Sequence, residues 1–239
     1  MTDTLRRVAL LALAGALAGA CGGERPAPAP ASTPASDSDP GFQVTAPVGS
    51  DSLARAVLID VTELDPSIQV YPSYATDHNF TGAVLPGYDA RRILLRREVA
   101  VALARAQAAL RPEHLGIRVF DGYRPVRATR AMVAWADSTG RSDLLDDGYI
   151  ARHSRHNLGV AVDLTLIDLE SGHPLEMGTA FDTFDPSAHT MNATGAVLQN
   201  RLKLKQALEA EGFTNYDQEW WHYSYPVAGA VPFDLPITR

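Results

Sequence analysis

Two separated stretches of the chain carry side chains that bind metal ions and move protons. The first, "SRHNLGVAVD", contains His156 and Asp163, and the second, "EWWHY", contains Glu219 and His222. A catalytic zinc ion commonly takes three protein ligands from His, Asp, Glu or Cys and leaves a fourth position for water. A carboxylate close to such an ion can accept the proton of that water. These residue types therefore indicate a metal-assisted hydrolytic site, provided that the two stretches meet in the fold.

The spacing of these residues fits a metal site only if the chain turns between them. His156 and Asp163 are seven positions apart, which would put them on opposite faces of one regular strand. The segment "HNLG" supplies a turn that ends at Gly159, so a histidine on the turn and an aspartate on the strand can meet one ion. Glu219 and His222 are three positions apart and also diverge on a straight strand, so we expect a bulge or a strand end there.

The spacing alone leaves an ordinary structural explanation open. A histidine beside a strand is usually a surface residue or a hydrogen-bonded core residue, and a tryptophan pair such as Trp220 and Trp221 usually packs in a core. The chain has seven histidines but no HExxH helix, so the common metalloprotease arrangement is absent. The spacing therefore does not decide between a metal centre and a core.

Three motifs, taken in order, add a resemblance to a known family. They are "DGYRP" (121–125), S-x-H-x-x-G-x-A-x-D (154–163) and "EWWH" (219–222). Together they resemble the D-alanyl-D-alanine dipeptidases, a family of zinc peptidases that includes the vancomycin-resistance dipeptidase. The similarity covers nearly the whole domain, from "YATDHNFTG" to "EWWHY". The wider superfamily also contains D-Ala-D-Ala carboxypeptidases and the hedgehog signalling domain.

The resemblance implies a role for each residue of the catalytic centre. It implies that one zinc ion per chain is bound by His156, Asp163 and His222. It further implies that Glu219 is the catalytic general base and that Arg124 stabilises the transition state. The four remaining histidines outside the motifs, and His153, are expected to have no metal role.

The resemblance also implies how a small substrate is held. Asp182 and Ser154 match residues that hold the free ammonium of the substrate, and Tyr149 is expected to line the pocket. Asn79 and Phe80 are further candidates for the pocket wall. Taken by its position alone, Asp182 would instead be assigned to a helix cap or a loop.

The expected activity is hydrolysis of D-Ala-D-Ala and related small dipeptides. A longer peptide would leave the carboxylate of Asp182 without the ammonium that it is expected to bind, at a cost of several kcal/mol. Two alternatives remain: a D,D- or L,D-carboxypeptidase that trims peptidoglycan peptides, and a wall-binding module with a structural zinc ion. Glu219 and Arg124 favour an enzyme, because a structural ion needs neither a base nor a partner for negative charge. An ion pair with Asp121 is the structural alternative for Arg124.

Hydrophobic spacing predicts the elements that must position these residues. We expect two short strands around an Asp-Pro turn in residues 60–70, and a cleft-lining loop in residues 74–88. A helix is expected over residues 89–110, where an apolar stripe recurs at helical spacing. The stripe consists of Leu95, Val99, Leu103, Ala106 and Leu110.

The second half of the chain is expected to add two strands and two helices. A strand over residues 116–123 ends before Pro125, which favours the first turn of a helix and puts Arg124 at the junction. "GVAVDLTL" alternates as a strand, with Asp163 on its smaller and more polar face. A last helix is expected over residues 194–211, ended by Gly212, and an aromatic-rich final strand follows it.

Composition and element order set the class of protein. With 239 residues, 46% hydrophobic and 21% charged, the chain has the balance of a soluble globular protein. Its net charge is −7, which argues against nucleic acid as a partner. The mixed element order, without repeats, predicts an α+β fold. The resemblance implies a hedgehog/DD-peptidase-like single catalytic domain over residues 41–239, with a small antiparallel sheet packed with helices.

The N-terminal segment predicts export and a lipid anchor. Residues 1–20 have two arginines followed by an apolar run, which is typical of a signal peptide. Cys21 follows Ala-Gly-Ala and resembles the lipidated cysteine of bacterial lipoproteins, although Ala18 stands where that motif usually has leucine. Residues 22–40 are rich in Pro, Ala and Ser and predict a linker. The expected location is the cell envelope, held to the membrane only through the lipid.

This location bears on the expected biological role. The vancomycin-resistance dipeptidases that the chain resembles act on D-Ala-D-Ala in the cytoplasm. An enzyme anchored outside the cytoplasm would not reach that pool. We therefore expect a role in scavenging or wall turnover.

Overall fold

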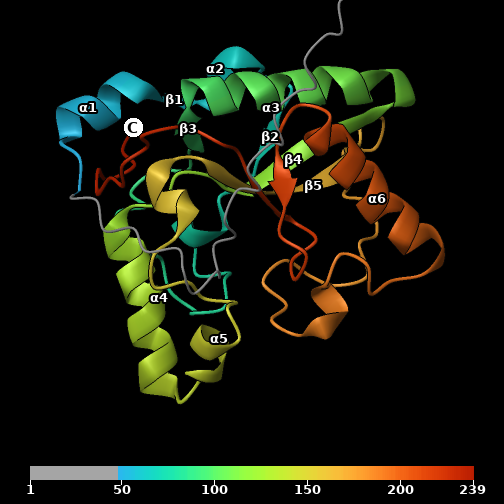
Figure 1. Cartoon of the computed structure of the whole chain (residues 1–239). Coiled ribbons are helices and arrows are strands. Elements are labelled where there is room, and N and C mark those ends of the chain that lie inside the picture. The colour runs from blue at the N-terminus through green and yellow to red at the C-terminus, as the bar shows by residue number, and fades with distance from the viewer. Residues whose placement is uncertain (1–47) are drawn as a thin grey trace, which may run out of the picture. The chain divides into compact units, whose positions relative to one another are not determined.

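The computed structural model describes residues 48–239. The predicted signal peptide (1–20), the lipidated Cys21, the linker (22–40) and the predicted domain start at residue 41 lie outside this part. In the described part, no helix is both long and apolar enough to cross a membrane. Helices, strands and short 3-10 turns follow one another without a repeating order (Figure 1). The helices are α1 (Asp51–Val57), α2 (Val61–Leu64), α3 (Arg97–Leu110), α4 (Val126–Thr139), α5 (Asp143–Asp146) and α6 (Gly195–Glu209).

A five-stranded sheet lies at the centre, in the order β2-β4-β5-β7-β6. Its strands are β2 (Gln69–Val70), β4 (Leu115–Asp121), β5 (Ala161–Asp168), β6 (Thr214–Asn215) and β7 (His222–Ser224). The predicted α+β class is confirmed, and the sheet is antiparallel except at one edge, where β2 and β4 run parallel. The parallel pair arises because the chain between them crosses over through α3, as parallel neighbours require.

The main hydrophobic core lies between this sheet and two helices. From β5 it receives Val162, Leu164 and Leu166, which are all fully buried. Helices α3 and α6 contact each other and also contact β4 and β5, respectively. The strand predicted around Asp163 is confirmed, but its polar face is buried as well, because β5 is flanked on both edges and covered on both faces.

The predicted helix over residues 89–110 begins later than expected. Residues Leu94–Arg96 form β3, which pairs with β1 (Leu58–Asp60) in a separate two-stranded sheet, and α3 starts at Arg97. Leu95 fits the helical stripe in sequence, but it is buried as a strand residue opposite Ile59. Hydrophobic spacing could not distinguish these two cases.

Of three other predicted elements, one is wrong and two are confirmed with changes. The first strand predicted in residues 60–70 is mostly the short helix α2, because Asp60 caps it by accepting a hydrogen bond from the Thr62 amide (3.0 Å). The final aromatic stretch forms two strands, β6 and β7, where one was predicted. Helix α6 lies within the range expected for the last helix, and Gly212 follows it with a φ of 92°.

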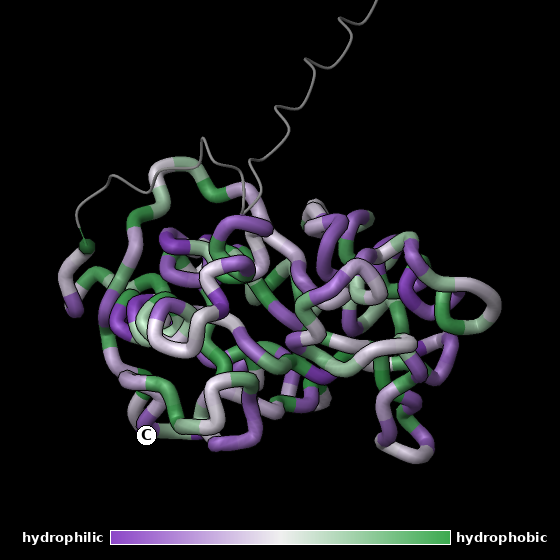
Figure 2. The backbone as a smooth tube through the Cα atoms, turned by 90° about the horizontal axis from the view of Figure 1, so that it is seen from below, coloured by the Kyte–Doolittle hydropathy of each residue, from purple (hydrophilic) through white to green (hydrophobic). Residues whose placement is uncertain are grey.

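A second hydrophobic core surrounds α4. It joins Met132 and Ala136 of α4 to Tyr74, Tyr123 and the C-terminal segment. The 3-10 turn η1 (Ser73–Ala75) interrupts the predicted loop of residues 74–88, which otherwise has no regular structure. Figure 2 shows hydrophobic and hydrophilic residues alternating along the tube every few positions, as one-sided burial of the elements requires.

Candidate active site

A row of cross-strand neighbours forms the base of the site. Asp163 on β5 lies opposite His222 on β7 and, on its other side, opposite Asp121 on β4. The strand register shifts between Val119 and Asp121, so β4 contains a bulge at that point. Because one extra residue in a strand changes which face the following side chain occupies, the bulge brings Asp121 to the same face as Asp163.

His156 reaches this row from a tight turn, as the sequence predicted. The turn is η3 (Arg155–Leu158), and the Ser154 hydroxyl caps it by accepting a hydrogen bond from the His156 amide (3.2 Å). Gly159 ends the turn with a φ of 70°, a left-handed conformation that glycine adopts without strain. A Cβ there would lie 2.7 Å from Leu58 Cδ2, so a larger residue would also displace the Leu58 side chain.

The three predicted metal ligands converge on one point. His156 Nε2 lies 3.2 Å from His222 Nδ1 and 3.4 Å from Asp163 Oδ1, and His222 Nδ1 lies 2.9 Å from Asp163 Oδ1. All three side chains are buried. Ligands bonded to a tetrahedral zinc ion at about 2.0 Å lie about 3.3 Å from one another. The donor set and its separations therefore fit zinc.

The protein around His156 orients it for this role. His156 Nδ1 lies 2.7 Å from the Gly122 carbonyl, which can only accept, so Nδ1 carries the proton. In the neutral ring, Nε2 then has its lone pair directed at Asp163 and His222. Burial alone would raise the pKa of Asp163, but His156 and His222 lower it below the ordinary value, so this carboxyl is ionised.

Arg124 lies beside the metal-binding residues, at the junction of β4 and α4. Its guanidinium donates to Asp121 Oδ2 (Nε 3.0 Å, Nη2 2.9 Å), and Nη2 also lies 3.8 Å from Asp163 Oδ2. The ion pair that the sequence offered as a structural alternative is thus present, and the same arginine also lines the pocket. Nη1 has the Met132 sulfur, a weak acceptor, at 3.4 Å. Tyr88 completes the group by donating to Asp121 Oδ1 (2.6 Å).

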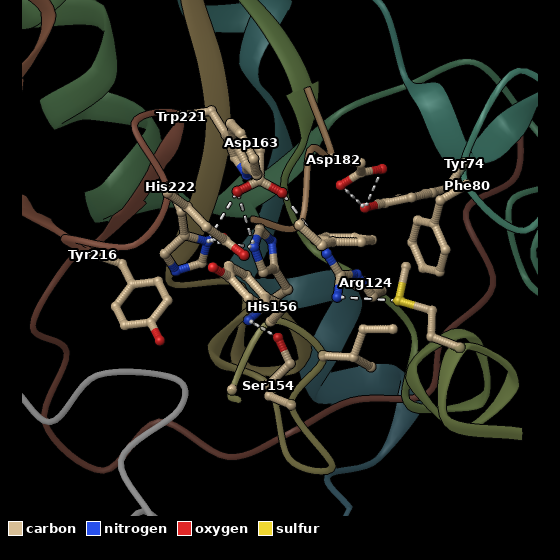
Figure 3. A pocket seen from close by; sticks show the side chains of 17 residues that line it. Tyr74, Phe80, Arg124, Ser154, His156, Asp163, Asp182, Tyr216, Trp221 and His222 are labelled. Atoms are coloured by element: carbon tan, nitrogen blue, oxygen red, sulfur yellow. Dashed lines mark hydrogen bonds and ion pairs between the residues drawn. The ribbon is translucent and has the colours of Figure 1, made fainter. Parts of the chain in front are cut away.

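Asp182 lies on a loop across the pocket and has an unusual backbone conformation. Its φ is 61°, in the left-handed region that non-glycine residues seldom occupy. The Tyr74 hydroxyl lies 3.0 and 3.2 Å from its two carboxylate oxygens (Figure 3). Burial raises the pKa of Asp182 well above its ordinary value, and the neighbouring Asp163 raises it further. A cation bound beside this carboxyl would stabilise its ionised form.

Glu219 lies next to His222 where β7 begins. A turn closed by the bond from the His222 amide to the Glu219 carbonyl (3.2 Å) ends at the first residue of the strand, in keeping with the bulge or strand end expected from the three-residue spacing. Glu219 Oε2 lies 3.9 Å from His222 Nδ1, and the residue is 7% exposed. The carboxylate is therefore within reach of a water molecule held between the metal-binding residues.

One pocket contains all eight predicted site residues (Figure 3). They are Arg124, Tyr149, Ser154, His156, Asp163, Asp182, Glu219 and His222. Of the two further candidates for the wall, Phe80 lines the pocket, whereas Asn79 is used inside its own loop, donating to the carbonyls of Thr76 and Ala83. His153 is exposed.

The sequence analysis missed three contributors to the site. Tyr74 was placed only generally in a cleft-lining loop, and Asp121 only as a structural partner of Arg124. Asn157 was not singled out, although its side chain accepts from the Ser154 amide and donates to the Arg124 carbonyl and the Thr129 hydroxyl. Each residue lies inside a quoted motif, but its role depends on contacts between distant segments.

A buried His2Asp set beside a glutamate and an arginine defines a hydrolase-type metal centre. The family model described as D-ala-D-ala dipeptidase, of the Peptidase_M15 family, matches residues 54–237. This match spans most of the chain, and the chain belongs to that family.

Relatives in several bacteria support the assignment. A D-alanyl-D-alanine dipeptidase of Streptomyces coelicolor is 36% identical over 74% of this chain and 96% of its own length. The protein of the same name from Enterococcus faecium is 35% identical over 69% of this chain and 90% of its own length. The one from Escherichia coli is 32% identical over 73% of this chain and 88% of its own length.

Solved structures match less closely. The vancomycin-resistance D,D-dipeptidase VanXYg, in complex with a D-Ala-D-Ala phosphinate analogue, is 21% identical with a TM-score of 0.38. The alignment covers 61% of this chain and 56% of that one. The family assignment rests on the sequence matches.

Proposed function

We propose that this protein is a zinc dipeptidase that hydrolyses D-Ala-D-Ala and related small dipeptides. The observation that carries the proposal is the mutual 2.9–3.4 Å separation of the donor atoms of His156, Asp163 and His222. When bound there, Zn²⁺ polarises the scissile carbonyl and makes water a competent nucleophile near neutral pH. The family to which the chain belongs is described by the same activity.

The chain's own residues supply the proton transfer and the charge stabilisation. Glu219 accepts a proton from the attacking water and delivers it to the leaving amine. Arg124 stabilises the negative charge that develops on the carbonyl oxygen, and its Nη1 is available because its partner, the Met132 sulfur, accepts only weakly. Asp121 and Tyr74 hold this guanidinium, by the ion pair and by a ring whose centroid lies 5.1 Å from Cζ.

Recognition of a dipeptide depends on its free ammonium. Asp182, with Ser154 and Tyr149 also lining the pocket, is the carboxylate that would pair with this cation. The raised pKa of Asp182 supports the assignment, because the positive charge of a substrate ammonium would stabilise the ionised carboxyl, as the charge of Arg124 already does. A blocked amine would leave Asp182 without that partner.

The substrate preference tests the proposal. We expect the zinc-loaded protein to hydrolyse D-Ala-D-Ala much faster than an N-acetylated tripeptide ending in D-Ala-D-Ala. The assay is release of free D-alanine at matched substrate concentrations. Preference for the blocked tripeptide would overturn the proposal and favour a carboxypeptidase that trims peptidoglycan peptides.

We also propose that the enzyme acts at the cell envelope, anchored through a lipid on Cys21. The supporting feature is the position of this cysteine, which is the only one in the chain and directly follows the apolar run. Replacing Cys21 by alanine in the full-length chain should move the protein from the membrane fraction to the soluble fraction of a bacterial host. Retention of the Cys21→Ala protein in the membrane fraction would overturn the anchor.

A further inference from the structure

The loop that carries Asp182 is long and contains little regular structure. Between Met177 and His189 the chain forms only the 3-10 turn η4 (Pro186–Ala188). The loop brings both Asp182 and Phe184 to the pocket. A loop of this kind needs contacts elsewhere to fix its shape, because its own backbone forms few hydrogen bonds.

One side chain of α6 holds both ends of this loop. Arg201 Nε donates to the Met177 carbonyl (2.8 Å) at the start of the loop. At its end, Nη2 donates to the Ser187 carbonyl (3.0 Å) and Nη1 to the His189 carbonyl (2.7 Å). These carbonyls lie on either side of Asp182 in sequence, so a single planar group fixes the separation of the two ends.

The guanidinium of Arg201 is buried, so its N–H groups depend on the loop carbonyls as acceptors. The residue is 1% exposed, and burial lowers the pKa of its guanidinium. A buried charge is tolerated only when its donors are satisfied, and here the backbone carbonyls of the loop satisfy them. Moving either end of the loop would leave a buried N–H of the guanidinium without an acceptor.

The backbone of Asp182 needs such support. An aspartate at a φ of 61° is strained, and such conformations persist only where the surroundings determine them. The carboxylate contacts Tyr74, which holds one side of the loop against the second core. Arg201 is the corresponding anchor on the side of the main core.

We propose that Arg201 is a positioning residue for substrate recognition, which holds the 177–189 loop in the shape that presents Asp182 to the ammonium of a dipeptide. The inference rests on the proposed function, since it assumes that Asp182 binds this ammonium. Arg201 itself does not line the pocket, so it acts only through the loop.

Two variants weaken the anchor from opposite sides. Arg201→Lys keeps the charge but has a single ammonium that cannot reproduce the planar fork. Gly178→Ala acts from the loop: Gly178 has a φ of 81°, and a Cβ there would lie 2.8 Å from Val197 Cγ1 and 3.3 Å from Arg201 Nη2. The control is Asn200→Ala, which removes an exposed bond from the same helix to the Glu176 carbonyl, just outside the loop.

The test is steady-state kinetics of the zinc-loaded protein on D-Ala-D-Ala, with zinc content measured in parallel. We expect Arg201→Lys and Gly178→Ala to raise KM by about tenfold or more, since misplaced binding groups are costly, with little change in kcat or zinc content. Asn200→Ala should leave KM unchanged. In an Asp182→Asn background, Arg201→Lys should raise KM by much less, because the group that it positions is already lost.

Other results would overturn either the role of Arg201 or the proposed function. Unchanged KM in both variants, a fall in kcat alone, or an equally large KM effect of Arg201→Lys in the Asp182→Asn background would overturn the role of Arg201 while leaving the proposed function intact. A wild-type protein that ignores D-Ala-D-Ala would overturn the proposed function, and the inference with it. If Arg201→Lys does not fold, Gly178→Ala decides alone.

Discussion

The proposed ligands of the metal are fixed by two different means. Hydrogen bonding to the Gly122 carbonyl sets the proton on His156, whereas Asp163 and His222 are fixed by pairing of β5 with β7. Such outer contacts reduce the freedom of each ligand before an ion binds. Glu219 is close to the same point but lies on the turn that precedes β7, so its side chain can change without disturbing the ligands.

Glu219→Gln should therefore separate catalysis from metal binding. We expect kcat on D-Ala-D-Ala to fall by about 10²- to 10⁴-fold, because the amide cannot accept a proton, while one zinc ion per chain is retained. Glu170→Gln, at an exposed position away from the pocket, is the control and should keep full activity. Loss of zinc from Glu219→Gln would assign this residue to the metal and contradict the proposed base.

Sequence reasoning identified residues with a distinctive chemical type and missed those whose role depends on geometry. His156, Asp163 and His222 have side chains that bind zinc, and the resemblance to the dipeptidases distinguished them from the other candidates. Asp121 was not assigned to the site, because strand alternation cannot anticipate the bulge that turns it toward Asp163. Arg201 gave no signal at all, since an arginine on a helix is ordinarily an exposed residue.

Among the elements, the turn η3 links the metal centre to the rest of the site. Asn157 belongs to this turn and is 4% exposed. Its side chain accepts a hydrogen bond from the Ser154 amide at the start of the turn. It also donates to the Arg124 carbonyl and the Thr129 hydroxyl, which lie just before and within the first part of α4. One amide side chain thereby fixes the position of His156 relative to Arg124.

Asn157→Ala should destabilise this link. Because it leaves several buried polar groups without partners, we expect the free energy of unfolding to fall by about 2–3 kcal/mol. Kcat should also fall, since His156 and Arg124 lose their fixed relation. Denaturant unfolding checks the stability, with Asn192→Ala, which removes one exposed bond to the Pro186 carbonyl, as the control. Equal effects of the two substitutions would argue against a special role for Asn157.

The boundary of an element could be predicted where the spacing of hydrophobic residues fitted only a helix or only a strand. It could not be predicted where the spacing fitted both. The stripe from Val99 to Leu110 predicted α3, but β3 has the same apolar character, and its pairing with β1 is invisible in the sequence. The strand at Asp163 was clear from alternation, whereas burial of its polar face depends on what covers the sheet.

At the scale of the molecule, the pocket lies where the two hydrophobic cores meet. Trp221 belongs to the main core, Tyr74 and Met132 belong to the second, and all three line the pocket. The proposed ligands come from two stretches that are distant in sequence, one with His156 and Asp163 and one with His222, so a bound ion would join η3 and β5 to β7.

Removal of the metal should consequently lower the stability of the whole domain. At a free zinc concentration of 100 times Kd, binding to the folded state contributes about 2.7 kcal/mol. We expect a chelator to lower Tm by several degrees and added zinc to restore it, as measured by thermal unfolding followed by circular dichroism. His156→Ala should show no such response, and an equal response in this variant would contradict binding at the proposed site.

The row formed by Asp121, Asp163 and His222 across β4, β5 and β7 has a consequence for folding. If β7 slipped by one position relative to β5, the His222 side chain would move to the opposite face of the sheet. A slipped sheet could then no longer assemble the ligand set. An ion that binds only the complete set would stabilise the correctly paired sheet relative to a slipped one.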